Sequence, residues 1–222
     1  MALSFRRLRE IARFLYLQRV KGFDVGDEPW LDEESKSWLS EQLAKADMYM
    51  EFGSGGSTRL AGRQGVPTIS VEGDRFFGEA VRAGLATGHN VQILDPKIGL
   101  TMEWGIPMPG TPSLKRVKRW SNYVDVPFEV LHRQNKPFPN LFLVDGRFRR
   151  ACVLRVALEA QRMRSDAHLL FDDYYEKGRE HYHRIEAPIG APRKIGRSAI
   201  FSISHDNPVR REQVEEAMQD YR

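Results

Sequence analysis

The stretch that decides the fold reads Glu51-Phe52-Gly53-Ser54-Gly55-Gly56-Ser57-Thr58. It joins an apolar run at residues 48–52 to a helix predicted over residues 58–64, so a strand is expected to turn into a helix here. Glycines let the backbone approach a ligand closely, and a helix N-terminus attracts carboxylate or phosphate. Glu72 closes the next apolar run at about the 20-residue spacing of an acid that binds ribose hydroxyls. This pattern predicts a nucleoside-containing cofactor, the alternative being a tight turn and a solvated acid.

Outward from this loop, short apolar runs alternate with segments of helical length. The predicted strands are residues 48–52, 68–72, 91–94, 141–145 and 168–171, and the predicted helices are residues 58–64, 75–85 and 148–163. Such alternation indicates an α/β fold with a Rossmann-like, doubly wound, mostly parallel sheet. Residues 184–203 predict a closing antiparallel hairpin that turns at residues 188–192. The proline-rich residues 96–127 predict a long loop acting as a lid, and residues after Pro208 predict a peripheral helix.

Composition narrows the class of protein. The chain has 222 residues, of which 41% are hydrophobic and 29% charged, a formal net charge of +4, and Cys152 as its one cysteine. A disulfide framework and a cysteine-rich metal site are therefore excluded. No apolar stretch approaches the roughly 20 residues of a membrane span, so we expect a soluble, cytoplasmic protein. The net positive charge is too small to indicate nucleic-acid binding.

The first 46 residues are predicted to be a helical appendage to one domain spanning residues 47–222. A basic helix is expected over residues 3–22, and a second helix is expected to begin at Asp32, whose side chain caps it with Ser35 in the first turn. Apolar side chains form a stripe on the first helix, which suits a homodimer contact. The alternative is a role at a membrane surface or in targeting.

The glycine loop departs from two common nucleotide-binding fingerprints. Thr58 stands where the dinucleotide pattern needs a third glycine, and no Gly-Lys-Ser/Thr follows to make a P-loop. Glu51-x-Gly53-x-Gly55 followed by Glu72 resembles the first two motifs of the class I S-adenosylmethionine-dependent methyltransferases. The resemblance implies that Glu51 supports the loop, that Glu72 holds the ribose and that Asp74 lies near the adenine. It assigns the methionyl end of the cofactor to Gly53, Ser54, Gly55, Gly56, Ser57 and Thr58.

Acidic residues follow two further predicted strands. Asp145 ends the run at residues 141–145, and Asp172 and Asp173 follow residues 168–171, so all three carboxylates are expected at one crevice. Such a cluster repels itself unless it binds a cation. The pattern resembles the metal-dependent O-methyltransferases, which implies Asp145, Asp172 and Asp173 as ligands of Mg²⁺ or another divalent cation. Alternatively, Asp145 binds the amino group of the cofactor or caps the next helix, and the other two cap another helix.

Three residues are candidates for the chemistry. Asp145 lies at the predicted crevice, Arg147 either clamps a substrate anion or pairs with a nearby acid, and His132 is either a general base or a surface residue. The resemblance implies methyl transfer to an oxygen of a small molecule or sugar, an anionic acceptor being one option. The alternatives are a nucleic-acid methyltransferase, which lacks support in base-methylation motifs here, and an inactive cofactor-binding scaffold.

Overall fold

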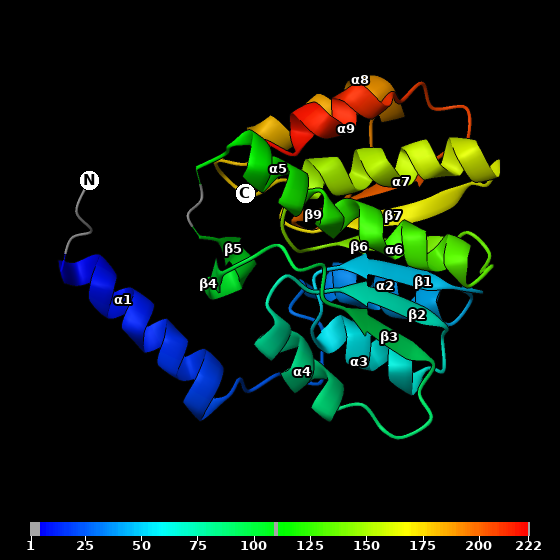
Figure 1. Cartoon of the computed structure of the whole chain (residues 1–222). Coiled ribbons are helices and arrows are strands. Elements are labelled where there is room, and N and C mark those ends of the chain that lie inside the picture. Colours follow the sequence, from blue (N-terminus) through cyan, green and yellow to red (C-terminus); the bar gives the residue numbers. More distant parts are fainter. Residues whose placement is uncertain (1–4, 109–110, 222) are drawn as a thin grey trace.

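The protein, seen in a computed structural model, is built around one seven-stranded sheet (Figure 1). The structure describes residues 5–108 and 111–221, so the predicted start of the first helix at residues 3–4 lies outside the described residues. Strand order across the sheet is β3-β2-β1-β6-β7-β9-β8, and all neighbours pair in parallel except β7 with β9 and β9 with β8. The strands are β1 (Tyr49–Phe52), β2 (Thr68–Val71), β3 (Val91–Leu94), β6 (Leu141–Val144), β7 (Ala167–Phe171), β8 (Arg193–Ile195) and β9 (Ser198–Ile203). The predicted doubly wound, mostly parallel sheet is confirmed.

Helices cover both faces of the sheet, and alternate residues of each central strand face opposite layers. On one face, Tyr49 of β1 and Leu143 of β6 pack with Leu39 of α2 (Glu33–Leu43) and with α3 (Gly56–Arg63). On the other face, Phe52 and Val144 pack in a larger core with three further helices. Those helices are α6 (Asn122–Arg133), α7 (Arg149–Met163) and α9 (Arg211–Ala217). Because both faces are buried, the central strands are mostly apolar, with Glu51 of β1 as a buried exception.

The N-terminal region divides into two parts. Helix α1 (Phe5–Tyr16) extends outside the sheet, as Figure 1 shows. The π-helical segment η1 (Leu17–Lys21), which follows it, contacts α4 (Arg75–Ala83). Gln18 of η1 is buried and hydrogen-bonds to Asp74, and Phe23 packs between Phe14 and Phe77. Helix α2, by contrast, packs in the core through Leu39 and Leu43. The predicted division into an appendage of residues 1–46 and a domain of residues 47–222 stays a prediction. The homodimer through the first helix stays a prediction.

Residues 96–108 and 111–127 contain more helix and strand than the predicted loop. They contain a small hairpin of β4 (Thr101–Met102) and β5 (Ile106–Pro107) around the 3₁₀ turn η2 (Glu103–Gly105), then α5 (Leu114–Trp120) and the start of α6. Pro127 lies inside α6 rather than before it, and Trp120, which belongs to the same stretch, is buried in the core. The prolines therefore misled the prediction of a continuous loop.

Two predictions for the C-terminal region need correction. The antiparallel hairpin exists, but it is β8 and β9 turning at residues 196–197, whereas residues 180–189 form η3 (Glu180–Ile185) and α8 (Glu186–Ile189). Helix α9 is not peripheral, because Val214 and Ala217 are buried where it packs on α7. In the described part of the chain, no helix is long and apolar enough to cross a membrane.

The loops after β1 and β6 touch at the point where the sheet reverses its direction of winding. Gly53 has a φ of 107°, and a Cβ added there would lie 2.8 Å from the backbone nitrogen of Gly146. A Cβ on Gly146 would lie 2.1 Å from the hydroxyl of Tyr123. Both positions therefore require glycine, and their contact fixes the width of the crevice between the two loops.

We predict that Gly53→Ala destabilises the protein more than Gly65→Ala. Gly65 also has a positive φ, 74°, but nothing lies within 4 Å of an added Cβ, so it reports the conformational cost alone, about 1 kcal/mol. At Gly53 the clash with Gly146 should add about 2 kcal/mol to the loss in free energy of unfolding, measured by urea denaturation. Equal losses for the two variants would show that the loops can separate without cost.

Candidate functional site

Strand register brings the sequence-predicted residues to one edge of the sheet. Phe52 of β1 pairs with Val144 of β6, and Val144 pairs with Phe171 of β7. The residues that follow these strands therefore emerge side by side, and the backbone N–H groups of Asp145 and Asp172 still donate to the neighbouring strand. The glycine loop, Asp145 and Asp172 meet at the carboxyl edge of the sheet, where ligands bind in such folds.

Glu51 lies beneath the glycine loop and holds its far end. Its carboxylate is completely buried and accepts hydrogen bonds from Tyr49 (2.9 Å), Ser57 (2.6 Å) and Thr58. Burial raises the pKa of Glu51, while the hydroxyl donors oppose that shift. Because the side chains of Ser57 and Thr58 donate hydrogen bonds to Glu51, only the backbone N–H groups of these two residues remain to bind a ligand at the start of α3.

One glycine of the loop is explained by chain packing. A Cβ on Gly56 would lie 1.9 Å from the carbonyl oxygen of Glu28, so residues 27–29 cross directly over the start of α3. Arg59 and Arg63 of α3 hold this crossing segment through hydrogen bonds to the carbonyls of Val25 and Asp27. Gly55, in contrast, has open space around its Cα. The loop therefore presents Gly53, Ser54 and Gly55 to the crevice.

Glu72 lies at the end of β2 and connects the glycine loop to an adjoining cavity. Its carboxylate accepts hydrogen bonds from the backbone N–H groups of Ser54 (3.2 Å) and Asp74 (2.8 Å). Burial raises the pKa of Glu72 to about 7, although the backbone donors oppose the shift. The cavity beside it has a volume of about 310 Å³ and is also lined by Asp95 and side chains of α4. An acid of this kind, buried beside a cavity, is typical of a ligand-binding position.

Asp74 is already engaged in a structural role. Its carboxylate accepts hydrogen bonds from the backbone N–H groups of Phe76 and Phe77 and so caps α4, and it also accepts from Gln18. Asp74 is 4% exposed. The structure thus places Asp74 beside Glu72 with its carboxylate occupied by the chain itself.

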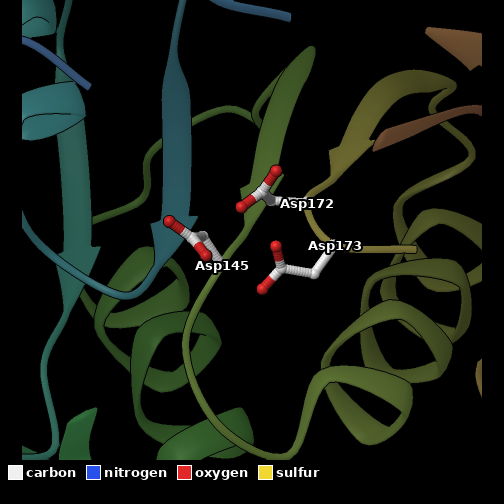
Figure 2. Close-up of side chains that lie close together, drawn as sticks. All are labelled: Asp145, Asp172 and Asp173. Atoms are coloured by element: carbon white, nitrogen blue, oxygen red, sulfur yellow. The ribbon is translucent and has the colours of Figure 1, made fainter. Parts of the chain in front are cut away.

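Asp145, Asp172 and Asp173 converge as the sequence predicted. One carboxylate oxygen from each lies within 4.8 Å of the others, and Figure 2 shows the three groups pointing toward one another. Two arginines lie among them. Arg197 forms a two-pronged ion pair with Asp172, at 2.9 and 2.7 Å, and Arg149 lies 3.1 Å from Asp145 and 3.2 Å from Asp173. Three carboxylates thus face two guanidinium groups.

This donor set does not fit a divalent cation. Asp172 is 1% exposed, and its oxygens accept from Arg197 and from the hydroxyl of Ser198 (2.9 Å). Asp173 also contacts both arginines, at 3.2 Å in each case. A metal would have to displace these donors and sit against two buried or half-buried positive charges. We therefore assign no metal to the three carboxylates that the sequence suggested as Mg²⁺ ligands.

Asp145 is the least engaged of the three carboxylates. One oxygen faces Arg149, and the side chain is 32% exposed toward the crevice, compared with 2% for Asp172. Burial raises the pKa of Asp145, Arg149 opposes the shift, and the charges of Asp172 and Asp173 add to it. A carboxyl group whose pKa is raised in this way is suited to accept a proton near neutral pH.

The two other catalytic candidates have different outcomes. Arg147 lies at the crevice, and its backbone N–H faces the hydroxyl of Tyr123 at 3.4 Å. His132 lies near the C-terminus of α6, where its Nε2 is 2.6 Å from Glu159 of α7. Glu159 is ten residues beyond Arg149 on the same helix, which corresponds to about 15 Å along the axis. The structure therefore does not bring His132 to the crevice.

Sequence reasoning did not predict the ion pairs that balance the charge of this site. Arg149 begins α7 only four residues after Asp145, and this short separation could have suggested the pair. Arg197 lies in the β8–β9 turn, 25 residues after Asp172, and no local pattern points to it. Trp30 was also missed, although Arg197 donates a hydrogen bond of 2.7 Å to its carbonyl oxygen.

We predict that Asp172→Asn lowers the free energy of unfolding by about 3 kcal/mol, because it leaves Arg197 without its buried partner. The loss should be the same with and without millimolar Mg²⁺ in urea denaturation. Asp206→Asn, at a side chain 87% exposed, is the matched control and should change stability by less than about 0.5 kcal/mol. Stabilisation of the wild-type protein by Mg²⁺ that disappears in Asp172→Asn would show that the carboxylates do bind the metal.

Comparison with known proteins places this geometry in a family. No protein-family model and no curated protein matches the chain. Among solved structures, a methyltransferase-like protein from Silicibacter pomeroyi is 30% identical, with 88% of this chain and 100% of that chain covered and a TM-score of 0.70. A Podospora anserina methyltransferase bound to S-adenosylhomocysteine matches at 10% identity, 92% and 98% coverage and a TM-score of 0.46, too remote to carry an argument. From its fold and its similarity to the Silicibacter pomeroyi protein, the chain belongs to the class I S-adenosylmethionine-dependent methyltransferase family.

Proposed function

We propose that the protein binds S-adenosylmethionine and transfers its methyl group to an oxygen of a small molecule or sugar. The observation that carries the proposal is the position of Glu72, which joins the glycine loop to a cavity of about 310 Å³ at the carboxyl edge of the sheet. The close approach of Gly53 and Gly146 supports it, because it brings the loops after β1 and β6 together at the carboxyl edge of the sheet, where ligands bind in such folds.

The chain offers a group for each part of the cofactor. Glu72 accepts hydrogen bonds from the ribose hydroxyls, and the cavity beside Asp95 receives the adenine. The backbone of Gly53, Ser54 and Gly55, at the start of α3, meets the methionyl carboxylate. The exposed side of Asp145 faces the amino group or the reacting centre. When bound, S-adenosylmethionine supplies an electrophilic methyl group on a sulfonium sulfur, which becomes a neutral thioether once the acceptor oxygen has taken the methyl.

Asp145 is the residue that removes the proton from the acceptor hydroxyl. A hydroxyl is a weak nucleophile, so the forming oxygen–carbon bond requires that its proton leave. Asp145 accepts that proton, since burial and the nearby charges of Asp172 and Asp173 raise its pKa. The positive charges of Arg149 and Arg197 reduce the repulsion among the three carboxylates, as a bound cation would.

Titration calorimetry should detect binding of S-adenosylmethionine and S-adenosylhomocysteine but not of NAD, whose fingerprint glycine is replaced by Thr58. Glu72→Gln should weaken binding of S-adenosylhomocysteine by about 10- to 100-fold, because a charged hydrogen-bond acceptor is lost. Glu41→Gln, an exposed change on α2, should leave the affinity unchanged. If neither sulfur nucleoside binds the wild-type protein, the proposal is wrong.

The same titration has a defined pH dependence. Ribose hydroxyls favour the ionised form of Glu72, whose pKa in the free protein is about 7. Affinity should therefore rise with pH, by about tenfold between pH 6 and pH 8, and then level off. In Glu72→Gln this rise should disappear. A pH profile that is identical in the two proteins would mean that Glu72 does not contact the nucleoside.

A further inference from the structure

Two exposed tryptophans lie against each other at the opening of the site. Trp30 is 78% exposed and Trp104 is 71% exposed, and their ring centroids are 5.9 Å apart at an interplanar angle of 83°. They come from separate parts of the chain, Trp30 from the segment before α2 and Trp104 from η2. Large aromatic side chains left this open indicate a surface that a ligand covers.

The backbone at each tryptophan lies next to residues of the crevice. The carbonyl oxygen of Trp30 accepts a hydrogen bond from Arg197, which in turn pairs with Asp172. Gly105 follows Trp104, and a Cβ on it would lie 3.7 Å from a carboxylate oxygen of Glu72 and 3.8 Å from the side chain of Arg147. Trp104 also holds a left-handed backbone, with φ 62° and ψ 25°. The pair therefore stands over the crevice between Glu72 and the carboxylate cluster.

Arg147 lies beneath this pair with its charge unmatched. Among the residues that the structure describes, no carboxylate pairs with its guanidinium, and its buried Nε has no hydrogen-bond partner. Burial lowers the pKa of Arg147, and the positive charges of Arg149 and Arg179 lower it further. Arg149 and Arg197 are neutralised by the aspartates, whereas Arg147 is not. A half-buried guanidinium in this condition is suited to bind an oxyanion from a ligand.

We infer that the methyl acceptor is an aromatic oxyanion, whose ring packs on Trp30 and Trp104 and whose carboxylate or phosphate pairs with Arg147. This inference rests on the proposed methyl transfer and narrows its substrate class. A sugar is disfavoured because its hydroxyls need free acceptors, whereas the oxygens of Asp172 and Asp173 already accept from Arg197 and Arg149. An aromatic ring needs only the two indole surfaces and one cation.

The test compares 6-hydroxy-2-naphthoate with its uncharged amide in titration calorimetry, with and without saturating S-adenosylhomocysteine. The acid should bind at least about tenfold more tightly than the amide, because only the acid forms a charge-assisted pair with Arg147. Arg147→Gln should reduce this preference to less than about threefold while leaving the affinity of the amide unchanged. The exposed change Arg133→Gln, at the C-terminus of α6, is the matched control and should preserve the preference.

The tryptophans should act on the ring rather than on the charge. Trp30→Ala and Trp104→Ala should each weaken the acid and the amide equally, by about three- to tenfold. Tyr16→Ala, at an aromatic residue 58% exposed on α1, should change neither affinity. Thermal unfolding of each variant should match the wild-type protein, since both indoles are exposed.

Three results would overturn the inference: equal binding of acid and amide, tryptophan variants that bind like the wild type, or tighter binding of glucuronate than of the naphthoate. If any of these occurs while S-adenosylhomocysteine still binds, the proposed methyltransferase activity stands and only the acceptor class is wrong. Failure of S-adenosylhomocysteine to bind, with acid preference intact, would instead remove the proposed activity and leave an aromatic-anion site.

Discussion

Gly53 and Gly146 bring the loops after β1 and β6 into backbone contact, and the positions of the other site residues follow from this contact. Parallel pairing delivers the ends of β1, β6 and β7 to one level, but only two residues without side chains let the first two loops meet. Glu72 then reaches the glycine loop from β2 and closes the same crevice. The sheet supplies the register, and the glycines set how narrow the crevice is.

Charge balance is the second constraint on the site. Asp145, Asp172 and Asp173 lie close enough to repel one another, and Arg149 and Arg197 compensate by binding them within the fold. This arrangement leaves Asp145 facing the crevice with a raised pKa, and among the described residues it leaves the guanidinium of Arg147 without a carboxylate partner. Asp172, Asp173, Arg149 and Arg197 thus form structural ion pairs, whereas Asp145 and Arg147 are left to act on a ligand.

The sequence predicted the sheet well because its strands are apolar and bounded by glycine, acid or proline. The strand at residues 91–94 was located to the residue, and the other four parallel strands to within one residue, whereas the hairpin strands were placed only within residues 184–203. Helix α6 was missed because the prolines of residues 96–127 suggested a loop, whereas packing of Trp120 and Phe128 overrides the cost of Pro127 within α6. The convergence of the three acids was also predictable. Arg197 was not, because its pairing with Asp172 depends on the tertiary position of the β8–β9 turn.

The proposed function depends on Glu72 holding the ribose of the cofactor and on the glycine loop holding its methionyl end. A crystal structure of the protein with S-adenosylhomocysteine tests it most directly. The ribose hydroxyls should lie within hydrogen-bond distance of the Glu72 carboxylate. The amino-acid end of the ligand should lie between the glycine loop and Asp145. A ligand bound elsewhere, or a Glu72 side chain turned away from the ribose, would contradict it.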